Sequence, residues 1–128
     1  MHLALVSLLV DDYDEAISWL ARCLDFEVRE DTPTEGKRWV VVGPRGGGGC
    51  GLVLARAANT RQRVAVGNQF GGRVGFFLHV DDFAVAETRL REHEVRIEGE
   101  PRDEPYGRVV VFRDMWGNRW DLVGKGKG

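Results

Sequence analysis

A short pattern occurs twice in this chain, and this internal repeat limits the fold more than any other feature of the sequence. Residues 8–20 read LLVDDYDEAISWL, and residues 78–90, which lie 70 positions later, read LHVDDFAVAETRL. Both copies place an apolar run before an Asp-Asp pair and helically spaced apolar residues after it. A unit that is longer than solenoid repeats and occurs twice indicates two similar modules, each burying one face of a sheet.

The first module is expected to run strand, helix, strand, strand, strand over about residues 3–54. Asp12 can cap the helix, with Glu15 three residues later in the position of a capping box. A glycine run follows the third strand, but a strand rather than a helix comes after it, so we interpret it as a loop and not as a phosphate cradle. The predicted elements are a strand over 3–10, a helix ending near 23–25, and strands over 26–30, 38–42 and 51–54.

The second module, over about residues 73–123, repeats this order after a small, polar linker at 55–72 that has room for a short helical turn. We treat residues 1–128 as one domain, with a disordered tail at 124–128. The predicted elements are a strand over 73–80, a helix from 81 to about 93, a strand over 95–98, a polar loop over 101–107, a strand over 108–113, a turn over 115–118 and a strand over 119–123.

Composition excludes several classes of partner. The formal net charge of −2 favours neither nucleic acid nor an anionic membrane as a partner. The apolar run near the start spans about eight residues, far fewer than the ~20 that cross a bilayer. Cys23 and Cys50 are too few for a disulfide framework and favour reduced thiols in a cytoplasmic protein.

Two segments resemble the vicinal oxygen chelate superfamily. LLVDDYDEAISWLARCLDFEV at residues 8–28 is similar to the opening of a module of that family, and FRDMWGNRWDLV at 112–123 is similar to its closing hairpin. The resemblance covers residues 3–123 in the right order. It implies an α+β fold in which two βαβββ modules form a cupped mixed sheet. The family includes glyoxalase I, extradiol dioxygenases, fosfomycin-resistance transferases and bleomycin-binding proteins, so the resemblance implies a fold more than a function.

The resemblance also implies where a metal would bind. In the family's enzymes the first strand of each module offers a ligand, usually histidine, and the last strand a glutamate. Aligning the repeats places the first-strand positions at Leu5 and Gly75, neither of which can bind a metal. The first module's carboxylate position falls near Gly51 or Leu52, and only Asp121 retains a carboxylate. We therefore expect no metal cofactor, with a divalent metal site as the alternative.

The three histidines do not replace the missing ligands in this alignment. His2 is an odd number of residues from Leu5, so on a regular strand it faces the other side. His79 shares a face with Gly75 but lies roughly 13 Å along the strand. His93 falls at the expected end of the second helix, where a solvated residue is common.

Without a metal, the cupped face is expected to act as a groove for a small molecule. Alternation puts Leu5, Ser7 and Leu9 on this face together with Gly75, Phe77 and His79. Trp39 is either a wall of the groove or a core or interface aromatic, and His79 is either a hydrogen-bonding group or structural. The candidate ligand-binding residues are Ser7, Trp39, Gln69, Arg73, Phe77, His79, Glu104, Tyr106 and Asp121.

Two main functions follow from this interpretation. The first is a small-molecule binder without the family's metal, acting as a homodimer because relatives usually complete their grooves across two chains. The second is an enzyme, either a metal-dependent lyase, isomerase or dioxygenase, or an acid–base catalyst using His79, Asp121 or Glu104. A pure interaction module is a third reading. Whether the modules pair within one chain or exchange between chains stays open.

Overall fold

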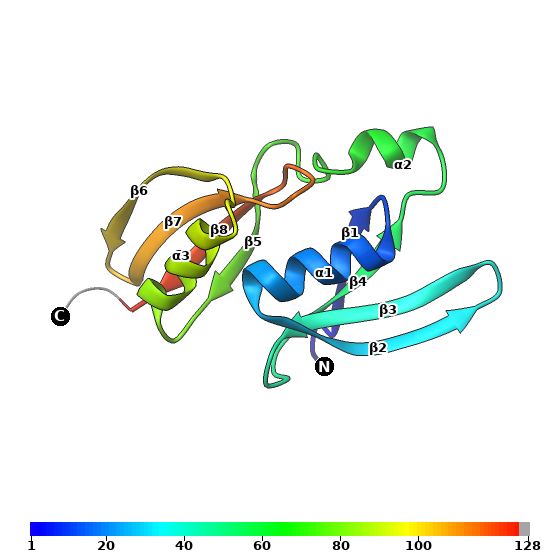
Figure 1. Ribbon diagram of the computed structural model, residues 1–128, viewed down its shortest axis with the longest axis horizontal. Helices are drawn as coiled ribbons and strands as arrows, with labels where there is room; N and C mark the ends of the chain where they lie inside the picture. Colours follow the sequence, from blue (N-terminus) through cyan, green and yellow to red (C-terminus); the bar gives the residue numbers. More distant parts are fainter. Residues whose placement is uncertain (126–128) are drawn as a thin grey trace. The chain divides into compact units, whose positions relative to one another are not determined.

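The computed structural model describes residues 1–125 and divides them into two units of matching architecture, the first covering Met1–Val66 and the second beginning at Gly67 (Figure 1). The elements of the first unit are β1 (Leu5–Val10), α1 (Tyr13–Leu24), β2 (Phe26–Thr34), β3 (Lys37–Pro44), β4 (Gly51–Arg56) and α2 (Thr60–Ala65). Those of the second are β5 (Val74–His79), α3 (Phe83–Glu92), β6 (Ile97–Glu104), β7 (Gly107–Arg113) and β8 (Arg119–Gly124).

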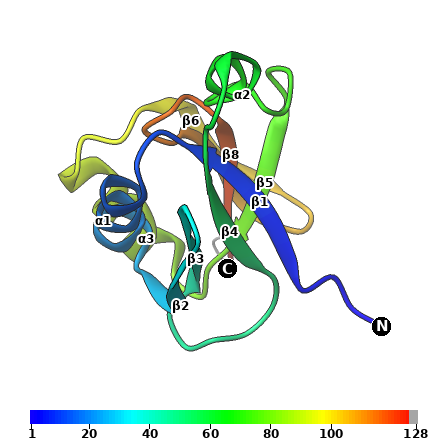
Figure 2. The same ribbon diagram turned by 90° about the vertical axis from the view of Figure 1, so that its right-hand side faces the viewer.

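Each unit contains one four-stranded mixed sheet, with the strand orders β1-β4-β3-β2 and β5-β8-β7-β6. The first strand of a unit runs parallel to its last strand, and the other neighbours are antiparallel. Figure 2 shows β1 beside β4 and β5 beside β8. The α+β fold with two βαβββ modules is therefore confirmed.

The Asp-Asp pairs of the repeat begin the two long helices. The side chain of Asp12 accepts a hydrogen bond from the backbone N–H of Glu15 at 2.8 Å, and Asp82 accepts one from Val85 at 3.1 Å. These contacts satisfy backbone donors that a helix start leaves without partners. Helix α1 ends at Asp25, which adopts a left-handed conformation with φ of 56°.

One face of each sheet packs against the long helix of its own unit. In unit 1 the fully buried Leu8, Val10 and Leu54 lie on this face, together with Ala16 and Leu20 of α1. Burial of the leucine and valine side chains contributes on the order of 2 kcal/mol each. The alternation predicted for the first strand is confirmed, because its even-numbered residues pack under the helix.

Aromatic side chains dominate the core of unit 2. The Trp120 ring lies 4.5 Å from Phe76 and 5.6 Å from Phe112, measured between ring centroids. Trp120 is 2% exposed, and its indole nitrogen donates to Asp114, so its one polar atom is satisfied inside the core. This packing leaves the opposite side of β8 to Asp121.

The predicted loop at 101–107 is wrong. Strand β6 continues to Glu104 and β7 begins at Gly107, leaving Pro105 and Tyr106 as the turn. The paired strands place Asp103 opposite Arg108, and these two side chains form an ion pair at 3.2 Å. Cross-strand pairing thus makes residues 101–104 part of a strand, although the proline and glycine content of this segment predicts a loop.

Three further expectations concern segments between or after the modules. The short helix α2, capped by Asn59, lies in the predicted linker 55–72. The predicted tail 124–128 is wrong at Gly124, which belongs to β8 and leaves no room for a side chain beside Phe83. Residues 126–128 lie outside the described residues. Among those described, no helix has the length and apolar character needed to cross a membrane.

Candidate functional site

The face of each sheet that the helix does not cover is called here the open face, and one row of cross-strand partners defines it in each unit. In unit 1 the row is Ser7, Val53, Val41 and Glu30. In unit 2 the equivalent row is Phe77, Asp121, Val111 and Glu98. The two rows align the modules residue by residue, so the counterpart of Asp121 is Val53.

This register moves the expected carboxylate position of the first module to another residue, which again has no carboxylate. The sequence alignment places the first module's carboxylate position near Gly51 or Leu52, whereas Ser7 and Phe77 are paired with Val53 and Asp121. Valine has no metal-binding group. Unit 1 therefore lacks a carboxylate at this position on the structural alignment as well.

Asp121 lies at the centre of the open face of unit 2. Its side chain is almost fully enclosed, with 8% of the residue exposed, and its Oδ1 atom has no hydrogen-bond partner among residues 1–125. Burial raises the pKa of this carboxyl group, and the positive charges of Arg102 and Arg119 act in the opposite direction. Such an acceptor can take a hydrogen bond from an N–H or O–H group of a ligand.

An ion network borders Asp121 on one side. Glu98 accepts hydrogen bonds from Arg113 and Arg119, and the bond from Arg113 is the main reason that the pKa of Glu98 is lowered. Arg113 also donates to the backbone oxygen of Gly117 at 3.0 Å. These contacts fix two guanidinium groups on the open face and compensate part of their charge with Glu98.

Glu104 and Tyr106 lie at the other end of the same face. Arg102 donates to Glu104 at 2.9 Å, and Tyr106 also hydrogen-bonds its guanidinium, so the pKa of Arg102 is raised. Arg102 is opposite Val109 in the register and its charge acts on Asp121. The structure therefore connects Glu104, Tyr106 and Asp121, three of the predicted site residues, through one arginine.

Phe77 and His79 complete the predicted residues on this face. Phe77 pairs with Asp121 across β5 and β8 and is 64% exposed, an unusual environment for a large aromatic side chain. His79 is exposed two positions along the same strand, opposite Val123. An aromatic surface and a buried hydrogen-bond acceptor are thus direct neighbours.

Gln69 and Arg73 lie elsewhere, in the segment before β5. Gln69 is half-buried and Arg73 is exposed, and the backbone N–H of Arg73 donates to Phe70. Neither residue belongs to a strand or to the rows that define the open faces.

Ser7 and Trp39 belong to the open face of unit 1. Trp39 is 39% exposed and donates from its indole nitrogen to Glu30 at 2.9 Å. It is therefore not a core residue of its unit, and its ring edge is fixed by a carboxylate. Ser7 is exposed and pairs with Val53.

Arg29, which is not among the candidate residues predicted from the sequence, also lies on the open face of unit 1. Its guanidinium covers Gly43 and donates from Nη2 to the backbone oxygens of Pro44 and Gly48, both at 3.2 Å. A β-bulge between Val28 and Glu30 makes Arg29 the extra residue of its strand. The occurrence of glycine on two neighbouring strands, at 43 and 51, was the available signal.

Gly75 is explained by packing rather than by a lost ligand. The pairing passes from Val74 opposite Arg119 to Phe76 opposite Trp120, so Gly75 is the extra residue of a bulge. A Cβ atom at this position would lie 2.1 Å from the ring of Phe70. The pairing of β5 is therefore irregular at Gly75, where regular alternation was expected.

The donor set does not fit the metal site of the family's enzymes. Neither unit, over residues 1–125, holds a group of three or more His, Cys, Asp or Glu side chains able to hold a metal ion. Structural and catalytic sites need three or four such ligands close together. Leu5, Val53 and Gly75 contribute none, and Asp121 faces arginines.

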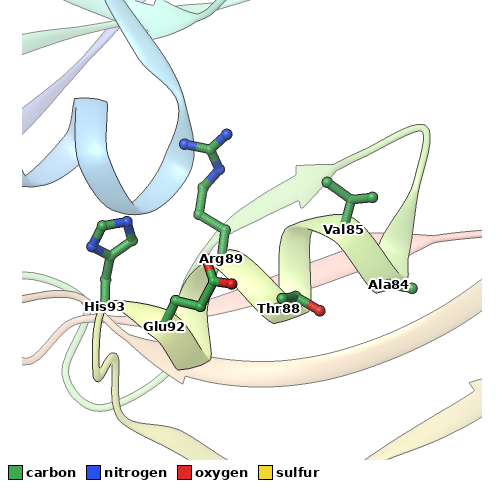
Figure 3. A pocket seen from close by; sticks show the side chains of 6 residues that line it. All are labelled: Ala84, Val85, Thr88, Arg89, Glu92 and His93. Carbon is green, nitrogen blue, oxygen red and sulfur yellow. The ribbon is translucent and has the colours of Figure 1, made fainter.

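One hollow is lined by side chains that all belong to α3 or to its C-terminal cap (Figure 3). Its lining consists of Ala84, Val85, Thr88, Arg89, Glu92 and His93. These residues come from one helix and its cap, and none of the candidate residues is among them. We therefore place the candidate site on the open faces.

Two four-stranded mixed sheets, each with one helix-covered face and one open face, define a class of α+β proteins built from a duplicated βαβββ module. The chain belongs to the Glyoxalase/Bleomycin resistance protein/Dioxygenase superfamily, whose family model matches residues 2–122. The resemblance to the vicinal oxygen chelate superfamily is thereby confirmed.

Sequence and structural comparisons agree with this membership. A protein of Shewanella frigidimarina (strain NCIMB 400), described only as uncharacterized, is 45% identical over 96% of this chain and 90% of its own length. UcmS2 is 30% identical with a TM-score of 0.81, covering 96% of this chain and 97% of its own. TnmS3, an antibiotic binding protein from Streptomyces sp. CB03234, is 28% identical with a TM-score of 0.76, covering 98% and 97%.

Proposed function

We propose that this protein binds a small organic molecule on its open faces, by aromatic contact and hydrogen bonding, without the metal of the family's enzymes. The likeness to the antibiotic binding protein TnmS3 supports a ligand of antibiotic size. The absence of a suitable ligand cluster among residues 1–125 supports the metal-free part of the proposal.

The observation that carries the proposal is the pairing of Phe77 with Asp121. The exposed ring of Phe77 offers apolar surface, and the orphaned oxygen of Asp121 beside it lacks a donor. A buried polar group without a hydrogen bond costs about 1–3 kcal/mol. A planar ligand covers the ring, and its N–H or O–H group supplies the missing donor once the side chains that bury the Asp121 oxygen move aside.

One observation favours a second function, metal-free acid–base catalysis. The raised pKa of Asp121 brings its carboxyl group closer to the range in which it can transfer a proton, and His79 is on the same face. The surrounding charges of Arg102 and Arg119 favour the ionised form instead. We therefore rank binding above catalysis.

A ligand screen tests the proposed function. Aromatic and glycopeptide antibiotics are added to the metal-free protein, and the melting temperature and amide NMR spectrum are recorded. A ligand at 100 times its Kd adds about 2.7 kcal/mol of stability. We expect this gain to fall in Phe77→Ala and Asp121→Asn and to persist in Val85→Ala, a change at an exposed position on α3. Equal responses of all variants, or no binding by any compound, contradict the proposal.

A further inference from the structure

We propose that Arg29 forms a subsite for the anionic group of the bound molecule, so that the ligand is an aromatic acid. This inference rests on the proposed function and adds a chemical class to its ligand. It concerns the open face of unit 1 alone, where Arg29 occupies a space that two glycines leave free.

The guanidinium of Arg29 occupies a space that exists because two neighbouring residues are glycines. A Cβ atom at Gly43 would lie 2.4 Å from Cζ of Arg29 and 2.7 Å from its Nη1. A Cβ atom at Gly51, on the neighbouring strand, would lie 3.2 Å from Nη1. Neither glycine has the positive φ that favours glycine over other residues, so their small size serves the arginine and not the backbone.

The charge of Arg29 is not neutralised within the described part of the chain. Its Nη2 donates to two backbone oxygens, its Nε is buried without a partner, and it forms no ion pair with a described carboxylate. The arginines of the other open face differ, because Arg102, Arg113 and Arg119 each contact a glutamate. Arg29 is thus a fixed cation with hydrogen-bonding capacity left over.

The surroundings of Nη1 strengthen the attraction for an anion. The side chains of Leu5 and Val41 lie on either side of the Gly51 position that Nη1 approaches. Apolar neighbours lower the local dielectric, which increases the interaction between a guanidinium and a bound oxyanion. Guanidinium groups bind carboxylates through short, charge-assisted hydrogen bonds.

Trp39 is the reason that we expect the ligand to carry an aromatic ring. It is on the same strand as Gly43, four residues away, so the two Cα positions are roughly 13 Å apart on one face. The Glu30 carboxylate bonded to Trp39 repels an anion at that end. An elongated aromatic acid therefore binds with its ring toward Trp39 and its carboxylate toward Arg29.

Arg29 also has a structural role that the test must separate from binding. Its bonds to Pro44 and Gly48 fasten the glycine-rich loop, so replacing Arg29 is expected to lower stability whether or not an anion binds there. A change in the stability of the variant therefore does not show whether an anion binds at Arg29. A higher affinity for a charged than for a neutral ligand of the same shape does show it.

The test compares biphenyl-4-carboxylate with biphenyl-4-carboxamide, which share shape but differ in charge. NMR titration of the full chain follows the amides of Gly43 and Gly51 and the Nε–H of Arg29. We expect the acid to bind the wild-type protein about tenfold more tightly than the amide, as a charge-assisted bond predicts. The preference should shrink to within about twofold in Arg29→Gln, persist in part in Arg29→Lys, and be unchanged in Arg61→Gln, an exposed arginine of α2.

Several results overturn the subsite. One is an equal preference in wild type and Arg29→Gln, and another is a titration that leaves the Arg29 Nε–H and both glycine amides unmoved. If Arg29→Gln fails to fold, the shift of the Arg29 Nε–H resonance in the wild-type titration still decides between the two outcomes. Equal binding of acid and amide on the open faces overturns the subsite while the proposed function stands, whereas the proposed function fails separately if its antibiotic panel does not bind.

Discussion

The indole nitrogen of Trp120 donates to Oδ2 of Asp114 at 2.9 Å, and both side chains are buried. The other carboxylate oxygen of Asp114 accepts from the backbone N–H groups of Trp116, Gly117 and Asn118. One side chain thus joins the core tryptophan to the turn before β8. Burial raises the pKa of Asp114, and these hydrogen bonds act in the opposite direction.

Replacing Asp114 by alanine is expected to lower the free energy of unfolding by about 3 kcal/mol, because several buried donors lose their acceptor together. Urea denaturation followed by circular dichroism measures the change. Asp81→Ala, at an exposed position, serves as the control and should change stability by less than about 0.5 kcal/mol. Similar values for both variants would show that Asp114 does not organise the turn.

Asp121→Asn is expected to stabilise the protein by roughly 1 kcal/mol at pH 7, since burial penalises the charged form of the wild-type carboxyl group, whose Oδ1 has no described partner. A raised pKa means that the folded state holds the proton more tightly than the unfolded state, so wild-type stability declines as pH rises above about 4. The gain in the variant should therefore disappear at lower pH. Urea unfolding at pH 7 and pH 3.5 measures it, and a pH-independent gain contradicts this explanation.

Glu98→Gln is expected to act in the opposite direction. The pKa of Glu98 is lowered by Arg113 first and Arg119 second, so its contribution is present above about pH 4.5 and is lost as pH falls through the lowered value. The variant should lose about 1 kcal/mol at pH 7, with the difference narrowing in acid. Unfolding midpoints across this pH range, with Glu92→Gln as the matched exposed control, give the answer.

Gly75→Ala is expected to cost about 2 kcal/mol, because its Cβ overlaps the Phe70 ring and the ring must move. Phe70→Leu in the same chain should recover part of the loss. A double-mutant cycle measured by thermal unfolding isolates this coupling. Additive effects of the two changes would mean that Phe70 does not fill the space beside Gly75.

Protein purified without chelator is expected to contain no stoichiometric Zn, Ni, Fe or Mn, and EDTA should leave its melting temperature unchanged. The reason is that no group of three or more His, Cys, Asp or Glu side chains among residues 1–125 is placed to hold a metal ion. Elemental analysis and a thermal scan provide the readout. One equivalent of metal that disappears in Asp121→Ala would reverse the proposal of metal-free binding.

The chain is also expected to form a homodimer, with a mass in solution twice the 14.4 kDa of one copy. Light scattering coupled to size-exclusion chromatography measures this mass directly. A monomer at micromolar concentration would show that the binding face is complete in a single chain. This expectation derives from the family resemblance.

Features that depend on neighbouring residues in the sequence were predicted well. The cap at Asp12 and the turn before β8 follow from side chains that bond backbone groups three or four residues away. The extended hairpin of β6 and β7 was missed, because Gly99 and Pro101 predict a loop and only pairing with β7 makes the segment a strand.

Features of the site that depend on strand register could be predicted only in part. Phe77 and Asp121 were placed on one face by alternation, which is regular in this part of the sheet. Arg29 and the irregular pairing at Gly75 were missed, because each of these residues is the additional residue of a bulge. The position of a bulge depends on the partner strand and is not visible in a single alternating pattern.

The ring of Phe70 limits which residues position 75 can accept. A histidine there would place its Cβ atom 2.1 Å from a carbon of that ring, so the ring would have to move. A metal-binding side chain therefore cannot be introduced at position 75 without also changing the packing around Phe70.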